Sequence, residues 1–223
     1  LGRPLTRRGL TRYRGMFASP LQSAGLPATA LPGAVHRAYF ELVTPAGVGL
    51  EVDLPVCVYL AATTEQGFAS RRRLAAPLVR QGVAALILEN PYYGWRRPRE
   101  QTFVAIPTIA DQLLMNTITV LETRALLRWL AGHGYTHLGV TGYSMGGFMA
   151  AYVASLVPGP VAAVPVAAGA SAVSSMTRTE FSRAIAWEAL CAQEGLEGPT
   201  HARQVLAELF DQIALDRMVG PTD

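Results

Sequence analysis

The sequence predicts an α/β fold in which a mostly parallel β-sheet is covered by helices on both faces. Short apolar runs alternate with longer segments of helical period, and this alternation is typical of parallel sheets. The 223 residues suffice for one domain with a sizeable core. Half of the residues are hydrophobic and 16% are charged, a composition that fits a globular protein and excludes a disordered chain.

Five segments are expected to be strands, because they are short, apolar and rich in β-branched or aromatic residues. They are residues 35–43, 55–61, 83–88, 137–141 and 161–168. Residues 48–53 are a candidate hairpin partner of the first strand.

Between these strands the apolar spacing predicts helices, over residues 70–81, 109–131 and 145–156. In the second helix, one face is expected to hold residues spaced by three and four, namely Leu114, Ile118, Leu121, Ala125 and Trp129. After Ala168 the pattern changes, because residues 181–191 and 203–218 both have a helical pattern with no strand between them. We therefore expect a helical cap or insertion over about residues 175–223.

The first 33 residues are expected to be a leader with little fixed structure, followed by a partial α/β domain over residues 34–223. The leader is rich in arginine, and no acidic residue precedes Glu41. An arginine-rich segment without acids can direct a protein to mitochondria, and the alternative is a solvated basic tail. Binding to nucleic acid would require a basic face on a known module, and we find no such module.

Other classes of site are not indicated. Two isolated cysteines, Cys57 and Cys191, provide neither a disulfide framework nor a zinc site. No stretch reaches the roughly 18 uninterrupted apolar residues that a membrane span needs, so any contact with a membrane would be peripheral. The sequence implies no metal or organic cofactor.

The segment from Gly142 to Gly146 (GYSMG) matches the G-x-S-x-G pattern of a nucleophile elbow, with Ser144 as the nucleophile. An apolar strand precedes it and a helix of small residues follows, which is the setting that the α/β-hydrolase fold provides. The serine would stand on a tight turn above the sheet, where glycine two positions before and after avoids a collision. The alternative is a glycine-rich turn with an inert serine.

Backbone N–H groups near this turn could stabilise the negative charge that develops on an ester carbonyl. Gly147 would let the following helix pack close to the sheet, and the N–H of Met145 at the start of that helix is one candidate donor. The second donor is expected from the loop after strand 55–61, at Thr63 or Thr64. The alternative for that loop is an ordinary surface turn.

The most specific signal is the unusual segment ENPYYG within residues 88–101 (LENPYYGWRRPREQ). Together with residues 142–150 (GYSMGGFMA) and the arginines at 71–73, it resembles the α/β-hydrolase-domain-containing protein 18 family. The resemblance covers about residues 35–190 and, weakly, the arginine-rich start. In the loop after strand 55–61, family members resemble LAGTGDH where this chain has LAATTEQ, from Leu60 to Gln66.

The resemblance implies a serine hydrolase of carboxylesterase or lipase type that acts on an acyl ester of a lipid, in or near mitochondria. A cardiolipin-like phospholipid is the candidate substrate to test first. The resemblance also implies that the protein continues past Asp223, because family members carry a variable insertion and then an acid- and histidine-bearing end. We expect the last two strands of the fold to be absent from this chain.

The triad of this fold runs in the order Ser, then Asp or Glu, then His. Downstream of Ser144 the only histidine is His201, which is expected at the start of a helix. His133 and His137 flank the start of the strand that ends at the elbow, so they belong at the opposite edge of the sheet. We expect this chain alone to be inactive, and the alternative function is a catalytically incomplete protein that binds a lipid or a partner without turnover.

Residues after the carboxyl end of strand 83–88 are candidates for holding the substrate. They are Tyr92, Tyr93, Trp95, Arg96, Arg97 and Arg99. Aromatic faces can line an acyl pocket and arginine suits a phosphate, so this segment is a candidate site for an anionic head group. The alternative is a structural turn whose aromatic rings pack on the core. Arg71, Arg72 and Arg73 are expected at a solvated helix start.

Overall fold

The computed structural model describes residues 1–21, 25, 31–101, 106 and 108–218. The chain divides into two compact units, Leu1–Ala168 and Gly169–Asp223. We call them the sheet unit and the helical unit.

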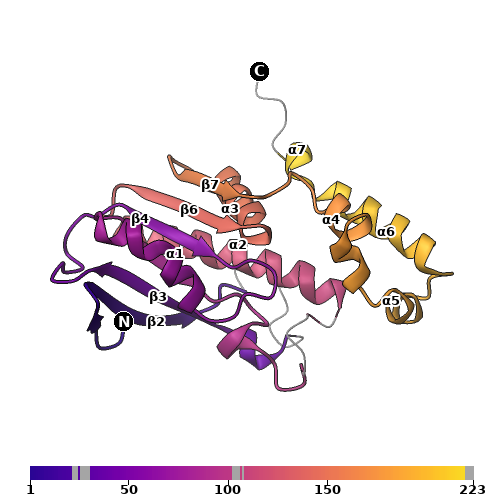
Figure 1. Ribbon diagram of the computed structural model, residues 1–223, viewed down its shortest axis with the longest axis horizontal. Coiled ribbons are helices and arrows are strands. Elements are labelled where there is room, and N and C mark those ends of the chain that lie inside the picture. The colour runs from indigo at the N-terminus through magenta and orange to yellow at the C-terminus, as the bar shows by residue number, and fades with distance from the viewer. Residues whose placement is uncertain (22–24, 26–30, 102–105, 107, 219–223) are drawn as a thin grey trace. The chain divides into compact units, whose positions relative to one another are not determined.

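Seven strands form one sheet within the described part of the sheet unit, in the order β1-β2-β3-β5-β4-β6-β7 (Figure 1). Their bounds are β1 Leu5–Arg7, β2 Leu10–Ala18, β3 Arg37–Pro45, β4 Val56–Leu60, β5 Ala84–Leu88, β6 Leu138–Tyr143 and β7 Ala162–Val166. Strands β4 to β7 are parallel to one another, whereas β1, β2 and β3 add antiparallel pairings on the β5 side. The sheet is therefore mixed, with its parallel half carrying the predicted elbow.

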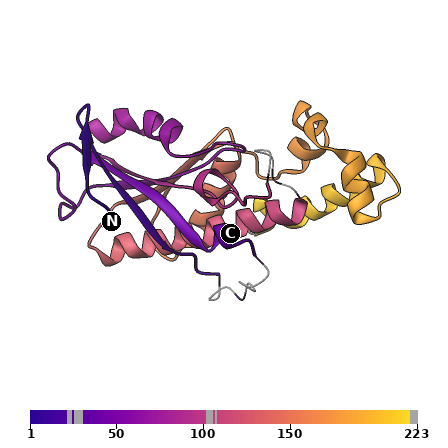
Figure 2. The ribbon, with the colours of Figure 1, turned by 90° about the horizontal axis from the view of Figure 1, so that it is seen from below.

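Helices cover both faces of this sheet, as Figure 2 shows. One face carries α1 (Ala69–Arg80), and the other carries α2 (Ile109–Gly132) and α3 (Met145–Leu156). Along β5, Ile87 packs in the α1 core and Leu86 in the opposite core. Successive residues of a strand point to opposite faces, so one apolar strand serves both cores.

The amino-terminal residues differ from the prediction of a leader with little fixed structure. β1 and β2 form a hairpin, and β2 pairs with the whole of β3. The prediction that residues 48–53 pair with that strand is wrong, because they form a turn-rich loop and no strand. Tyr13 and Phe17 of β2 pack on the core, whereas Arg14 and Met16 are exposed. Arg12 and Arg14 occupy outward-facing positions of a strand that has one buried face. The many arginines make the alternation of apolar and polar residues hard to recognise in the sequence. Residues 22–24 and 26–30 of the predicted leader lie outside the described residues.

Helix α2 has nearly its predicted bounds, but its buried face is rotated by about one residue. The buried side chains are Met115, Ile118, Thr119, Val120, Glu122, Thr123, Leu126, Leu127 and Leu130. Only Ile118 is shared with the predicted face. The prediction followed apolar residues alone, whereas the actual face includes Glu122, which is paired with a buried arginine.

The helical unit contains helices and no strand over its described residues, 169–218. They are α4 (Val173–Thr177), η5 (Glu180–Ala184), α5 (Trp187–Glu194), α6 (Pro199–Gln212) and α7 (Leu215–Met218). The buried ring of Trp187 donates its N–H to the carbonyl of Ser182 at 2.8 Å, and the Arg203 guanidinium lies 4.5 Å above it. Within the described ranges of the whole chain, no helix has the length and hydropathy required to cross a bilayer.

Candidate active site

Ser144 lies between the end of β6 and the start of α3, with φ 53° and ψ −118°. Residues other than glycine rarely adopt a positive φ, and such strain is concentrated at functional turns. The N–H of Ser144 donates to the carbonyl of Val166 at 2.9 Å, and its carbonyl accepts from Phe148 at 3.0 Å. These two bonds fix the turn, while the serine itself is exposed.

Three glycines allow backbone segments to approach closely around this turn. A Cβ on Gly142 would lie 2.4 Å from the carbonyl carbon of Gly146, and one on Gly146 would lie 2.5 Å from the carbonyl oxygen of Leu60. A Cβ on Gly147 would lie 2.9 Å from that of Ala168. Backbone atoms cannot move aside as flexible side chains do, so the turn packs against the end of β4 only because these positions lack side chains.

The loop at residues 62–67 follows β4 and therefore begins beside the elbow. Four of its backbone N–H groups have acceptors in the protein, those of Ala62, Thr64, Glu65 and Gly67. Those of Thr63 and Gln66 have none among the described residues. Thr63 is the nearer of the two to Ala61, whose carbonyl oxygen would lie 2.9 Å from a Cβ on Gly146.

The two residues predicted to supply the second donor therefore differ in whether their N–H is already hydrogen-bonded. Thr64 has φ 65° and donates its N–H to the hydroxyl oxygen of Tyr93 at 2.8 Å. Thr63 keeps its N–H unpaired within the described part of the chain. The expectation of a donor at Thr64 is wrong for this conformation, because its N–H is already engaged.

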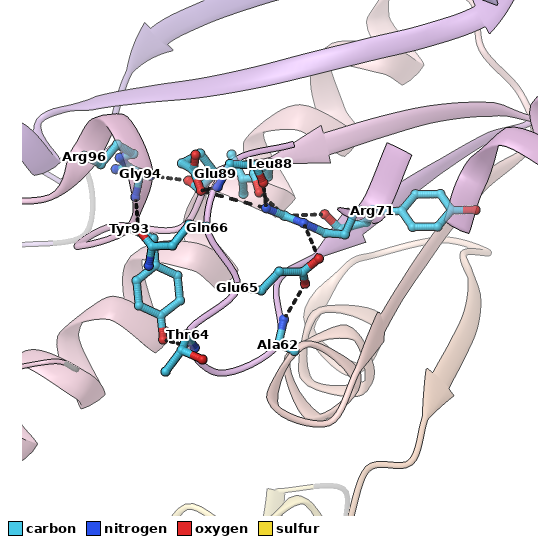
Figure 3. A network of polar contacts seen from close by, with 12 residues as sticks. Ala62, Thr64, Glu65, Gln66, Arg71, Leu88, Glu89, Tyr93, Gly94 and Arg96 are labelled. Carbon is cyan, nitrogen blue, oxygen red and sulfur yellow. Dashed lines mark hydrogen bonds and ion pairs between the residues drawn. The ribbon is translucent and has the colours of Figure 1, made fainter. Parts of the chain in front are cut away.

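Arg71 anchors the loop (Figure 3), and it is 2% exposed instead of lying at a solvated helix start. It donates to the carbonyl oxygens of Tyr59 at 3.3 Å, Gly67 at 2.6 Å and Leu88. Tyr59 and Leu88 lie at the carboxyl ends of two neighbouring parallel strands, β4 and β5, so one guanidinium ties both ends together.

Two carboxylates compensate the buried charge of Arg71. Glu65 lies 3.6 Å and Glu89 lies 3.8 Å from guanidinium nitrogens. Burial raises the pKa of Glu89, while the charge of Arg71 lowers it. Arg72 pairs with Glu41 at 2.5 Å, and Arg73 is exposed, so the three arginines have three different environments.

Three of the residues predicted to hold the substrate are buried. Tyr92 and Tyr93 are each 1% exposed, and the Tyr92 hydroxyl donates to Asp111 at 2.7 Å. Arg96 is fully buried and binds Glu122 through two hydrogen bonds of 2.6 and 2.7 Å. The assignment of Arg96 to an anionic head group is wrong, because its guanidinium is enclosed and paired. The alternative of a structural turn describes this part of the segment.

The rest of the segment is accessible. Trp95 is 55% exposed and packs edge-on against Tyr39 and Phe68. Arg97 and Arg99 are exposed. Their place as substrate-binding residues stays a prediction.

Residues 1–216 match the protein family described as alpha/beta hydrolase domain containing 18. The chain belongs to this family. The match includes the hairpin β1–β2, the elbow and most of the helical unit.

Three solved structures are similar to this member of the family. An acetyl xylan esterase from Paenibacillus sp. R4 is 15% identical with a TM-score of 0.60, over 92% of this chain and 64% of that chain. A cold-adapted esterase from an Arctic intertidal metagenomic library is 15% identical with a TM-score of 0.51, over 70% and 60%. A thermostable esterase from Pseudomonas putida ECU1011 is 20% identical with a TM-score of 0.42, over 66% and 38%. The chain spans less than two thirds of each solved protein. The likeness to the first two shows an α/β-hydrolase fold.

The histidines of the sheet unit are bonded elsewhere than at Ser144. His36 contacts the carbonyl of Leu31 at 3.3 Å, His133 that of Trp129 at 2.8 Å, and His137 the Thr136 hydroxyl at 2.9 Å. His201 belongs to the helical unit and accepts from the N–H of Glu197 at 3.4 Å.

Sequence reasoning missed the acidic partners of the two buried arginines, Glu89 and Glu122. Glu89 had a usable signal, because an acid directly after a fully apolar strand lies at the carboxyl edge where α/β sites form. Glu122 had none, since one acid in a long helix gives no indication of its partner.

Proposed function

We propose that this protein is a serine ester hydrolase with Ser144 as its nucleophile. The observation that carries the proposal is an exposed serine at φ 53°, held at the amino terminus of α3 against the end of β4. The first N–H of a helix has no intrahelical acceptor, so that of Met145 is free to bind an anion. The unpaired N–H of Thr63 belongs to the neighbouring loop.

In the proposed reaction, Ser144 Oγ attacks the ester carbonyl while a histidine takes its proton. The carbonyl oxygen becomes an oxyanion, which accepts hydrogen bonds from the N–H groups of Met145 and Thr63. The alcohol then leaves with that proton, and water releases the acid from the acyl-enzyme. Since the histidines of the sheet unit are bonded elsewhere, the proposal places the base outside Leu1–Ala168.

For the substrate we propose an acyl ester of an anionic lipid, with a cardiolipin-like phospholipid as the first compound to test. What supports an anionic head group is the exposed pair Arg97 and Arg99, in the segment that follows the carboxyl end of β5 by nine and eleven residues. An ester is supported by the solved structures of similar fold, which are described as esterases. We also propose a mitochondrial location, which rests on the family resemblance because the arginine-rich start is folded into β1 and β2, and fluorescence imaging of the tagged protein tests it.

The decisive experiment treats the protein, at the length at which its cells make it, with a fluorophosphonate probe. We expect covalent labelling that is lost in Ser144→Ala and kept in Ser155→Ala, which alters an exposed serine of α3 whose hydroxyl donates to the carbonyl of Tyr152. Absence of labelling in the unaltered protein would overturn the proposal and favour binding of a lipid or a partner without turnover.

The head group is tested separately with a pair of esters, one anionic and one neutral. Arg97→Ala is expected to raise KM several-fold for the anionic ester alone. Arg80→Ala is the matched control, because Arg80 is an exposed arginine at the far end of α1. Equal effects of Arg97→Ala on both esters would contradict a role for Arg97 in recognising charge.

A further inference from the structure

Two loops at the carboxyl edge of the sheet are tied together by three hydrogen bonds (Figure 3). They are residues 62–67, after β4, and residues 89–94 (ENPYYG), after β5. The bonds run from Thr64 N–H to the Tyr93 hydroxyl at 2.8 Å, from Gly67 N–H to Glu89 at 3.0 Å, and from Gly94 N–H to Gln66 at 2.6 Å. Both loops supply donors and acceptors, so each restrains the backbone of the other.

We infer that Tyr93 is a positioning residue for the oxyanion donor Thr63, an inference that rests on the proposed function. Tyr93 occupies the N–H of Thr64 and thereby holds that residue at φ 65°. On the other side of Thr63, the Ala62 carbonyl accepts from the Glu65 N–H at 3.1 Å, so the peptide that carries the Thr63 N–H is held as well. That N–H is unpaired among the described residues. The Tyr93 hydroxyl does not contact the substrate, but it would determine which N–H of the loop is free to bind the substrate.

The ring of Tyr93 is well suited to this role because it is enclosed by packed side chains. It is 1% exposed and belongs to a cluster of buried residues with Val35, Ala61 and Met115. The side chain of Met145 packs against the same cluster. One rigid group of side chains therefore supports the start of loop 62–67 and the start of α3, which carry the two proposed donors.

The backbone of Tyr93 is anchored to the sheet as well. Its N–H donates to the carbonyl of Asn90 at 3.3 Å, and the preceding Glu89 accepts from Gly67 and lies 3.8 Å from Arg71. Arg71 in turn binds the carbonyl of Leu88, at the end of β5. Functional groups need such support, because a displacement of about 1 Å is enough to weaken a transition-state interaction.

Removal of the hydroxyl leaves the Thr64 N–H without its acceptor, so loop 62–67 gains alternative conformations. Charge on the carbonyl oxygen develops only in the transition state, so mispositioning of its donor lowers kcat and leaves KM unchanged. Complete loss of one such donor costs about 100- to 1,000-fold in kcat. Because Thr63 is displaced and not removed, we expect a decrease of about 10- to 100-fold.

The test compares Tyr93→Phe with Tyr92→Phe. Both variants lose one hydroxyl and one hydrogen bond at adjacent residues of equal burial, but the Tyr92 hydroxyl binds Asp111 and not the loop. Kinetics with p-nitrophenyl butyrate should show the loss of kcat, at unchanged KM, for Tyr93→Phe alone. Hydrogen exchange followed by mass spectrometry should show faster amide exchange over residues 62–67, again for Tyr93→Phe alone.

Three outcomes would overturn the inference. One is turnover by Tyr93→Phe equal to that of the unaltered protein, and another is an equal loss in both variants. The third is unchanged amide exchange over residues 62–67 in Tyr93→Phe, which would show directly that Tyr93 does not hold the loop. This measurement does not depend on catalytic activity. An unaltered protein without turnover is a different result, because it overturns the proposed function, while exchange still decides whether Tyr93 holds the loop.

Discussion

Arg96 and Glu122 form an ion pair that is fully buried, with two hydrogen bonds of 2.6 and 2.7 Å between guanidinium and carboxylate. The Ser19 hydroxyl donates to the same carboxylate at 2.5 Å. Arg96 also donates to the carbonyls of Val35 and Glu89. The pair therefore joins α2 to the segment after β5 and to the chain on either side of residues 22–30.

Removal of Arg96 alone should be strongly destabilising, because it leaves a buried carboxylate without a counter-charge. We expect Arg96→Met to lower the free energy of unfolding by about 3–5 kcal/mol, measured by urea denaturation. The double variant Arg96→Met/Glu122→Leu should be closer to the unaltered protein, since neither charge remains. A double variant less stable than the single one would contradict this account.

The same substitution should make stability depend on pH. Burial raises the pKa of Glu122, and Arg96 opposes that effect. Without Arg96 the carboxyl group has a folded-state pKa above its unfolded value, so stability is greatest at low pH and is lost as pH rises through that folded pKa. The deficit of Arg96→Met should therefore be smaller at pH 5 than at pH 8, and a deficit independent of pH would show that Glu122 does not titrate in this range.

Thr64→Gly should stabilise the fold. A left-handed conformation costs a residue with a Cβ about 1–2 kcal/mol, and the greater freedom of glycine in the unfolded chain offsets about 0.4–1 kcal/mol of that gain. The net gain, about 1 kcal/mol near the middle of these ranges, should raise Tm by roughly 2–4 °C in calorimetry. Thr63→Gly is the matched control and should lower Tm, because Thr63 is not among the residues with positive φ.

Gly146→Ala should disrupt the elbow. The new methyl group would lie 2.5 Å from the carbonyl oxygen of Leu60, so α3 must move away from β4. We expect a loss of about 1–3 kcal/mol in stability and loss of fluorophosphonate labelling. Gly132→Ala, at the end of α2, has nothing within 4 Å of the new Cβ and should leave both unchanged or raise stability slightly.

Alkaline conditions should destabilise the sheet through β4. Burial raises the pKa of the Cys57 thiol to about 12 and, with a contribution from Cys57, that of Tyr59 to about 12. The thiol of an unfolded cysteine has a pKa of about 8.5. Burial of the neutral Cys57 thiol therefore costs no stability below that pH, and stability is lost as pH rises from there toward 12. Urea midpoints measured from pH 8 to 11 should fall less steeply in Cys57→Ala, and parallel curves for the two proteins would refute this.

Much of the architecture could be predicted from apolar periodicity. β4, β5 and α3 lie within a residue or so of their predicted bounds, because an apolar run between turn residues has few alternatives. β1 and β2 differ from the prediction, because an arginine-rich composition without acids is typical of a solvated tail. An outward-facing strand position tolerates arginine, so this composition does not exclude a strand. What makes residues 10–18 a strand is their pairing with β3, which lies far away in the sequence.

The candidate site was predictable in part. The setting of Ser144 follows from local sequence alone, since strand, turn, glycines and helix are contiguous. The surroundings of Arg71 and Arg96 do not, because charged residues are usually exposed and the acidic partners Glu89 and Glu122 lie 18 and 26 residues away in the chain. Only the fold brings such pairs together. The fold likewise decides that the N–H of Thr64 is bonded to Tyr93, whereas that of Thr63 is unpaired among the described residues.

The three hydrogen bonds between residues 62–67 and 89–94 restrict how this protein can be redesigned. A chimera that receives only the first loop from another hydrolase would bring a backbone that Tyr93 and Glu89 no longer fit. Both segments would have to be grafted as one unit, together with Arg71, which binds the carbonyls of Gly67 and Leu88. Directed evolution at either loop should, for the same reason, yield improved variants mainly when the two are randomised together.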